Sequence, residues 1–307
     1  MLKILVLEAD RLNGVTWWRC YKPFSELRRR HPELSFDFKN QVTVVDLMMY
    51  DLIITYRPTQ AAQLKFLQTA QMFGIPVIID CDDDLFNLPP SHPMAAEYNS
   101  ARHVFAESLS LASYVWVSTE DLLYSCDALG KGEVMQNAVT PEDLPNAPAP
   151  WKGVFSWRGN EMHIADLLEH RKWYERSTGM AQEWRWIGYF PPFRHGSNAR
   201  HLAYNQNVAD YMMTLGKSGI NVVWKPLEDN AFNAAKSNIA GIEATMMGGV
   251  CVTNFAGRKQ WGNALKDFPT DPEVVAMTWE RSRADILENY NLHEVNERRY
   301  LSIKNLA

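Results

Sequence analysis

Residues 76–84 read PVIIDCDDD, an apolar run that ends in a cluster of carboxylates. Residues 77–79 are β-branched and apolar, which is typical of a strand buried on both faces of a parallel sheet. In open α/β sheets, ligands bind beyond the carboxyl ends of the strands. The stretch therefore predicts a parallel sheet whose polar residues gather at one edge, where function is expected.

Similar apolar runs recur on both sides of this stretch and alternate with longer amphipathic segments, a pattern typical of sheets covered by helices on both faces. In the first half we expect strands at 3–9, 34–38, 51–57, 76–84, 114–119 and 132–139, and helices at 16–31, 60–73, 95–112 and 119–128. In the second half we expect strands at 153–159, 183–189, 221–227 and 249–254, and helices at 163–177, 203–216 and 231–247.

A proline-rich segment separates the two halves, with Pro141, Pro145, Pro148 and Pro150 in ten residues, and it is typical of a linker. The sequence thus predicts an α/β protein with two doubly wound, Rossmann-like domains that face a cleft. Their expected bounds are 1–140 and 153–307, with the linker at 141–152.

The bulk properties fit two domains, because 307 residues with 46% hydrophobic side chains exceed one typical core. The net charge of −5 gives no general attraction to nucleic acid or anionic membranes. No apolar run approaches the roughly 20 residues of a membrane span, and Met1 leads directly into a predicted strand, so we expect a cytoplasmic protein. The four cysteines are scattered without a CxxC pair, which favours neither zinc nor disulfides.

The carboxylates Asp80, Asp82, Asp83 and Asp84 raise one another's pKa unless a positive group is near. A divalent metal, the hydroxyls of a sugar or Arg57 could each compensate them, and a helix N-cap cluster is the structural alternative. We take Asp82 and Asp83 as candidates for contacts to sugar or acceptor. A second hypothesis makes Asp80, Cys81 and Asp82 an Asp-x-Asp metal site that binds donor phosphates.

In the second half, Arg158 and Gly159 end a predicted strand, where the guanidinium is suited to a diphosphate. His163 and Asp166, three positions apart, are expected to form a surface ion pair.

The predicted helix 231–247 carries two charged residues in an otherwise apolar segment. Lys236 and Glu243 are seven positions apart, so both are expected on one helix face toward one elongated ligand. A nucleoside diphosphate satisfies both, because lysine neutralises phosphate and a carboxylate accepts hydrogen bonds from ribose hydroxyls.

Gly14 precedes the first predicted helix and would let a phosphate approach the helix N-terminus, although a simple turn also accounts for it. Basic and aromatic residues follow it: Arg11, Trp17, Trp18, Arg19, Tyr21, Lys22, Arg28, Arg29 and Arg30. Such a cluster can stack an extruded DNA base and hold backbone phosphates. Alternatively, the tryptophans lie in the core and the arginines on a solvated helix face.

Seven stretches, in their order and spacing, resemble group 1 (family 4-like) glycosyltransferases of the GT-B fold, including compact bacteriophage members. They are GVTWWRCYKPFSEL, YDLIITYRP, GIPVIIDCDDDLFNLP, VSTEDL, MQNAV, WRGNEMHIADL and PLEDNAFNAAKSNIAGIEATMMGG. The resemblance spans nearly the whole chain. It implies that the first domain mostly binds the acceptor and the second the nucleotide sugar, with a retaining transfer that needs no metal or other cofactor.

Carried over by position, the resemblance implies that Gly14 lies at the donor phosphates, Arg158 and Lys236 hold the diphosphate, and Glu243 binds the ribose. Further expected donor contacts are Gly159, Asp229, Asn230, Asn233 and Ser237, and expected acceptor contacts are Trp17, Trp18 and Arg57.

The chain departs from the family at Ala235, where relatives carry a second glutamate that touches the transferred sugar. Glu228, Asp229 and Asn230 are candidates to replace it. The departure also leaves open a nucleotide-sugar binding protein without catalysis. The expected acceptor is a hydroxyl, either of a saccharide or of a hydroxymethylated DNA base, which some phage enzymes of this kind glycosylate.

Overall fold

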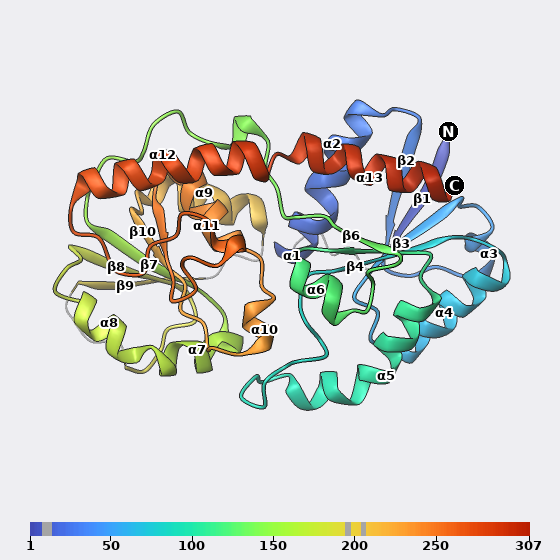
Figure 1. Cartoon of the computed structure of the whole chain (residues 1–307), viewed down its shortest axis with the longest axis horizontal. Helices are drawn as coiled ribbons and strands as arrows, with labels where there is room; N and C mark the ends of the chain where they lie inside the picture. The colour runs from blue at the N-terminus through green and yellow to red at the C-terminus, as the bar shows by residue number, and fades with distance from the viewer. Residues whose placement is uncertain (8–13, 194–197, 204–206) are drawn as a thin grey trace. The chain divides into compact units, whose positions relative to one another are not determined.

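The structure, a computed structural model, describes residues 1–7, 14–193, 198–203 and 207–307. The chain divides into two compact units, each built around one parallel sheet (Figure 1). Unit 1 comprises Met1–Pro90, Met94–Asn137 and Leu292–Ala307, and unit 2 comprises Ser91–Pro93 and Ala138–Asn291. The predicted α/β class with two doubly wound parallel sheets is therefore confirmed.

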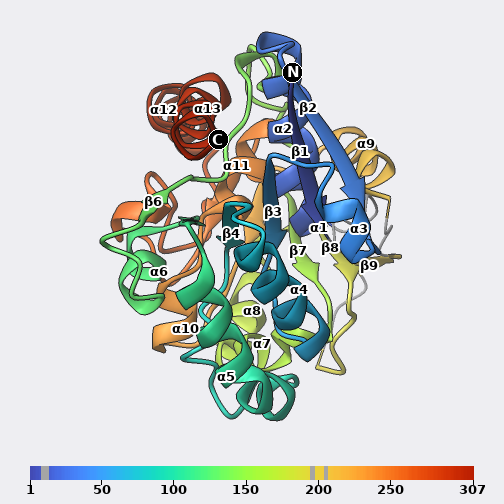
Figure 2. The same cartoon turned by 90° about the vertical axis from the view of Figure 1, so that its right-hand side faces the viewer.

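Unit 1 contains a six-stranded parallel sheet in the order β2-β1-β3-β4-β5-β6. The strands are β1 Leu2–Leu7, β2 Leu34–Lys39, β3 Leu52–Tyr56, β4 Val77–Cys81, β5 Tyr114–Val117 and β6 Gly132–Val134. The helices are α1 Gly14–Thr16, α2 Lys22–Arg30, α3 Val44–Leu47, α4 Ala61–Met72, α5 Ala95–Leu111, α6 Glu120–Ser125 and α13 Leu292–Leu306, with a π-helical turn at Trp17–Tyr21. Helices α2 and α13 pack together on one face, and α4 packs with α5 on the other (Figures 1 and 2).

The central strands of this sheet are buried along their whole length. Every residue of β3 and β4 is buried. This agrees with their continuous apolar runs, which predicted strands covered on both faces. The strand order reverses between β1 and β3, and such a switch point is where open α/β sheets bind ligands.

Unit 2 contains a five-stranded parallel sheet in the order β11-β10-β7-β8-β9. The strands are β7 Val154–Gly159, β8 Glu183–Gly188, β9 Ala199–Leu202, β10 Val222–Trp224 and β11 Val250–Val252. The helices are α7 Ile164–Glu169, α8 Arg171–Ser177, α9 Val208–Ser218, α10 Ala231–Ala234, α11 Ile239–Met246 and α12 Pro272–Asn289, with 3₁₀ turns at Pro141–Asp143, Glu161–His163 and Lys259–Trp261. Helices α7 and α8 lie on one face, and α9 and α11 on the other (Figure 1).

An aromatic core fills the face of this sheet that α8 covers. Because alternate residues of a strand point to one side, β7, β8 and β10 bring four indoles together with Tyr174 of α8: Trp157, Trp184, Trp186 and Trp224. Each of the four indoles is fully buried. Their neighbouring ring centroids lie 5.0 to 6.5 Å apart, which is the range of favourable aromatic pairs.

The C-terminal helix α13 belongs to unit 1, whereas the sequence placed it in the second domain, at 153–307. Its buried polar residues bind unit 1 directly. Asn296 Nδ2 donates to the Pro23 carbonyl at 2.8 Å, and Ser302 Oγ accepts from Trp116 Nε1 at 3.1 Å. An amphipathic helix pattern does not reveal which sheet its buried face covers, so the sequence could not place this segment.

The predicted linker 141–152 is also part of a unit, because it packs on unit 2. Thr140 caps the 3₁₀ turn through Asp143. Further on, Ala149 N donates to the carbonyl of Gly248 at 2.8 Å, and Asn221 Nδ2 donates to the Pro150 carbonyl at 3.1 Å. Gly248 has φ +80°, and a Cβ there would lie 2.4 Å from Ala149 N, so only glycine permits this contact.

In the described ranges, no helix combines the length and the apolar character that crossing a bilayer requires.

A buried ion pair ties the π-helical turn of unit 1 to β4. Arg19 Nε and Nη2 donate to the two carboxylate oxygens of Asp80 at 2.7 and 2.9 Å, and Nη1 donates to the Met135 carbonyl at 2.5 Å. Both side chains are at most 1% exposed. The carboxylate is thus fully compensated inside the sheet.

We expect Arg19→Met to lower the free energy of unfolding by about 3 to 5 kcal/mol, because it leaves the Asp80 carboxylate buried without its cation. Urea unfolding of the two proteins measures the difference. Arg29→Met is the matched control, since Arg29 forms an exposed pair with Glu26 and should cost less than about 1 kcal/mol. Arg19→Met within 1 kcal/mol of the parent protein would contradict the role given to this pair.

Candidate functional site

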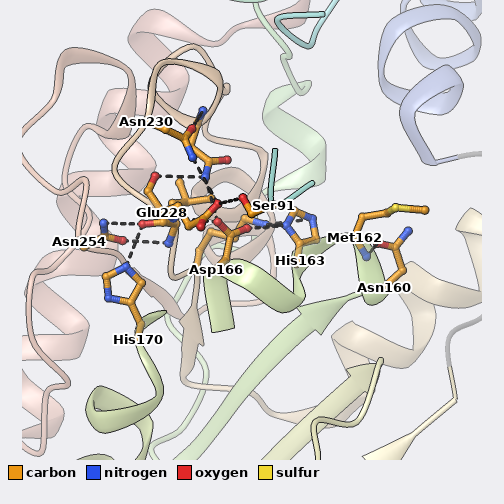
Figure 3. A network of polar contacts seen from close by, with 12 residues as sticks. Ser91, Asn160, Met162, His163, Asp166, His170, Glu228, Asn230 and Asn254 are labelled. Atoms are coloured by element: carbon orange, nitrogen blue, oxygen red, sulfur yellow. Dashed lines mark hydrogen bonds and ion pairs between the residues drawn. The ribbon is translucent and has the colours of Figure 1, made fainter. Parts of the chain in front are cut away.

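The switch point of unit 2 lies between β7 and β10, which are parallel neighbours in the sheet. Arg158 and Gly159 end β7, and Lys225 directly follows β10. These three residues therefore lie at the edge where open α/β sheets bind ligands. The polar network that surrounds this edge is drawn in Figure 3.

Asp166, in the first turn of α7, is the centre of that network (Figure 3). It is 5% exposed and accepts three hydrogen bonds: from His163 Nδ1 at 2.9 Å, from the Glu228 amide at 2.7 Å and from Asn233 Nδ2 at 2.9 Å. Burial acts to raise the pKa of Asp166, but the His163 hydrogen bond and the charge of Lys225 outweigh it and lower the pKa to about 2. The expected surface ion pair is thus a hydrogen bond between a half-buried imidazole and a buried carboxylate.

His163 lies between Asp166 and Lys225. Its Nδ1 contacts the carboxylate, so Nδ1 carries the proton. Lys225 Nζ lies 3.4 Å from Nε2 and 3.5 Å from Nδ1, so the amine packs against the ring rather than along the lone pair of one nitrogen. Burial, and secondly the charge of Lys225, lower the pKa of His163 to about 4. The imidazole is therefore neutral at physiological pH.

The loop after β10 is held by neighbouring elements on several sides (Figure 3). Leu227 exchanges two hydrogen bonds with the side chain of Asn254, at 3.0 and 2.8 Å, and its carbonyl lies 2.9 Å from His170 Nε2. Glu228 Oε2 accepts from Ser91 Oγ at 2.8 Å. The loop is consequently fixed before any ligand binds, and preorganisation of this kind lowers the cost of binding.

Three of the predicted donor contacts have structural partners in this loop. Asn230 caps α10 by accepting from the Asn233 amide at 2.8 Å, and Asn233 in turn donates to Asp166. Asp229 lies 3.2 Å from Arg258 in an exposed ion pair. Ala235, where relatives carry a glutamate, is 2% exposed.

The predicted helix 231–247 is broken, and this expectation was wrong. Helix α10 ends at Ala234 and α11 begins at Ile239. Lys236 and Ser237 lie between the two helices, where Ser237 and Asn238 disfavour a helix interior because their side chains compete for backbone hydrogen bonds. Lys236 Nζ lies 4.2 Å from the centre of the Phe232 ring, a cation–π contact.

Glu243, in α11, pairs with Arg158, so the structure brings together two residues that the sequence assigned to separate parts of a ligand. Glu243 is 2% exposed, and Oε2 also accepts a hydrogen bond from Tyr211 Oη at 3.2 Å. The guanidinium lies over the Tyr211 ring at 5.8 Å. Sequence reasoning missed Tyr211, because nothing in its helix pattern distinguishes it from a core residue.

Gly159 makes room for the network. A Cβ at this position would lie 2.8 Å from the Trp157 ring and 3.0 Å from His163, closer than real Cβ atoms lie. The glycine thus lets the His163 ring pack over the end of β7. Its predicted role at a phosphate stays a prediction.

In unit 1, the carboxylates after β4 are each compensated by a different neighbour. Asp82 accepts from Tyr56 Oη, and Asp83 lies 2.5 Å from Arg57 Nη1. Burial, followed by the charge of Asp83, raises the pKa of Asp82. Arg57 has φ +42°, a left-handed conformation that is uncommon for arginine and typical of strained functional positions.

The remaining two carboxylates serve the fold. Asp84 accepts from the Phe86 amide at 3.1 Å and from Ser125 Oγ at 2.6 Å within a turn. The N-cap alternative was wrong, because the next helix, α5, begins only at Ala95. Both oxygens of Asp80 are engaged by Arg19, which speaks against the Asp-x-Asp metal hypothesis. A search of the described ranges finds no group of three or more metal-ligating His, Cys, Asp or Glu side chains.

The basic and aromatic cluster near Gly14 does not form one surface. Trp18 and Arg19 are buried, whereas Arg28, Arg29 and Arg30 are exposed on α2. Arg29 pairs with Glu26 and Arg30 with Glu297. Arg11 lies outside the described residues. The base-stacking reading was therefore wrong for Trp18 and Arg19, and the exposed arginines form the solvated helix face. Trp17 is half-buried, and Gly14 begins α1.

The neutral His163 predicts a pH dependence of stability. Its pKa is about 4 in the folded protein and about 6.5 when unfolded, so the unfolded chain binds more protons between these values. We expect the free energy of unfolding to fall by about 2 to 3 kcal/mol from this residue alone as the pH drops from about 6.5 to about 4.

Chemical denaturation of the parent protein and His163→Gln across this pH range tests the expectation, because glutamine does not titrate. His103→Gln is the control, since His103 is exposed on α5. An equal loss of stability in the parent protein and His163→Gln would show that the ring is not held neutral.

Several solved structures match over nearly the whole chain, among them the following three. Anabaena Alr3699/HepE in complex with UDP and glucose has a TM-score of 0.64 at 12% identity, covering 99% of this chain and 100% of that one. S. aureus MnaA with UDP has a TM-score of 0.54 at 11% identity, with 100% and 98% covered. UDP-GlcNAc 2-epimerase from Neisseria meningitidis bound to UDP-GlcNAc has 0.51 at 11%, with 99% and 100% covered.

No protein-family model and no curated protein matches the sequence. Identities this low carry the fold alone. The structural matches and the two parallel sheets together establish that this chain has the GT-B fold.

Proposed function

We propose that the chain is a glycosyltransferase that moves a sugar from a nucleoside diphosphate sugar to a hydroxyl acceptor. The observation that carries the proposal is the position of Arg158 and Lys225 at the ends of the neighbouring strands β7 and β10, at the switch point of unit 2. Lys236 follows α10, and its charge lowers the pKa of Lys225. Three cations at this edge suit a diphosphate. The GT-B fold, shared with structures that hold UDP, supports the same ligand class.

In this proposal the cations contribute most to catalysis, by stabilising the leaving group. The bond from the anomeric carbon to the diphosphate oxygen breaks, and Arg158 and Lys236 stabilise the negative charge that grows on the leaving group. Glu243 orients Arg158 and accepts hydrogen bonds from the ribose. Asp82, Asp83 and Arg57 are the candidates in unit 1 for contacts to the acceptor hydroxyl. The proposal has three finer parts. The anomeric configuration is retained, the donor carries a hexosyl or pentosyl group, and the acceptor is a saccharide or a modified DNA base.

A second candidate is a nucleotide-sugar epimerase. It is favoured by the match to the Neisseria meningitidis UDP-GlcNAc 2-epimerase over the full length of both chains. The two activities differ in their products, because an epimerase returns an intact nucleotide sugar of altered configuration, whereas a transferase releases the nucleoside diphosphate.

A thermal-shift screen against nucleoside diphosphate sugars, followed by product analysis by NMR, tests the proposal. We expect one donor class to raise the apparent Tm, since a ligand bound only by the native state stabilises it. We also expect release of the nucleoside diphosphate to persist in excess EDTA, because cationic side chains take the place of a metal at the diphosphate.

The other outcomes are equally specific. Turnover abolished by EDTA and restored by manganese would favour the metal hypothesis. An intact epimerised donor would favour the epimerase, and stabilisation without any turnover would indicate a binding protein.

We further expect Lys236→Ala and Glu243→Gln each to weaken donor binding or turnover by about 10- to 150-fold, the range for loss of a charge-assisted hydrogen bond worth about 1.5 to 3 kcal/mol. Isothermal titration and initial rates measure the effect. Lys172→Ala is the control, because Lys172 is exposed on α8. Unchanged binding and turnover in both variants would mean that the two residues contribute to the packing of the fold and not to donor binding.

A further inference from the structure

Lys225 is a half-buried amine that packs against the uncharged ring of His163. Its Nζ lies 3.4 Å from His163 Nε2 and 3.5 Å from Nδ1. Within the described part of the chain, no carboxylate oxygen comes within 4 Å of this Nζ. The His163 Nδ1 proton faces Asp166, so the ring is uncharged and gives the lysine no countercharge.

The charged and titratable groups around Lys225 do not supply a full countercharge. They come from β7, the turn before α7, α7 itself, the segment after α10, and β11: Arg158, His163, Asp166, Lys236 and Cys251. Arg158 and Lys236 are cations and repel an ammonium. Asp166 is the nearest anion, but its oxygens already accept from His163, an amide and Asn233.

This environment disfavours the charged form of the amine. Burial, the larger effect, and the charges of Lys236 and Arg158 lower the pKa of Lys225 to about 7, although Asp166 acts in the opposite direction. A diphosphate at the same edge of the sheet would bring negative charge to these cations, and a nearby opposite charge favours the ammonium form.

We propose that the Lys225 amine takes up one proton from solvent when a diphosphate binds at the β7–β10 switch point. The inference rests on the proposed function, because it assumes an anionic donor at this edge. In this step solvent or buffer gives one proton, the Nζ lone pair accepts it, and no other bond changes. The uncharged His163 ring, which lies 3.4 Å from Nζ, holds the amine in place without supplying a countercharge.

Binding must then depend on pH in a defined direction. Below about pH 7 the free protein already carries the charge, so affinity should be flat. Above about pH 7, protonation has to accompany binding, so affinity should fall by up to about tenfold per pH unit. A permanently charged arginine at position 225 should remove this slope, and an uncharged methionine should weaken binding at pH 6 and also remove it.

Isothermal titration with UDP-glucose is the first experiment, because this probe has no phosphate group that titrates between about pH 6 and 8.5. Titrations at pH 8.5 in buffers of different ionisation enthalpy count the protons taken up. We expect close to one proton per site for the parent protein and for Lys172→Met, and close to none for Lys225→Arg and Lys225→Met. Uptake that persists in both Lys225 variants, or no uptake in the parent protein despite binding, would overturn the proposal.

Trace acetylation of the free protein over about pH 5 to 10, read by mass spectrometry, separates this inference from the proposed function. We expect Lys225 to become reactive at a pH well below that of exposed Lys172, and saturating UDP or pyrophosphate to reduce its reactivity at pH 8 about tenfold or more.

If Lys225 reacts together with exposed lysines, the amine is not neutral and the inference fails, whatever the donor. If Lys225 reacts early but no nucleotide, nucleotide sugar or pyrophosphate binds, the proposed function fails and proton-linked binding fails with it.

Discussion

A carboxylate buried at the end of a parallel strand needs a donor or a cation for its oxygens, because an uncompensated buried charge costs several kcal/mol. Both units satisfy this constraint at the carboxyl edges of their sheets. In unit 1 the guanidinium of Arg19 binds Asp80, and in unit 2 Asp166 accepts from His163 and Asn233. Arg19 and Asn233 come from distant segments, so each compensated carboxylate also fixes the position of a loop or turn at the carboxyl edge of its sheet.

The strands were the most predictable part of the fold, because a strand that is buried on both faces consists of a continuous run of apolar residues. The run at 76–84 contains β4, Val77–Cys81, and among the described residues every strand except one overlaps a predicted strand. Strand β9, Ala199–Leu202, was missed, since it lies at the edge of its sheet and its residues are exposed or half-buried. An edge strand has less apolar surface to bury, and its sequence carries a correspondingly weak signal. The placement of α13 was unpredictable for another reason, because helix amphipathicity shows that a face is buried but not against what.

The candidate site was predictable residue by residue but not as an arrangement. Arg158, Lys236 and Glu243 stood out because charged residues in apolar surroundings need an explanation. Their partners did not, since ion pairs across 85 positions, as between Arg158 and Glu243, leave no local pattern. The break between α10 and α11 defeated the helical spacing that had placed Lys236 and Glu243 on one face. Lys225 was missed because it was counted as part of the predicted strand 221–227. In the structure it directly follows β10, just as Arg158 lies at the end of β7.

The different partners of Arg158 and Lys225 follow from their chemistry. An empty anion site with several half-buried cations is destabilised by desolvation and by repulsion among like charges. Arginine cannot lose its proton in a protein, so a partly desolvated guanidinium requires a permanent countercharge, and Arg158 has Glu243. Lysine can lose its proton, so Lys225 can lie against the uncharged ring of His163 without a countercharge in contact with it. A site built in this way carries less charge when empty than when an anion occupies it, and it therefore combines affinity for an anion with a stable fold in its absence.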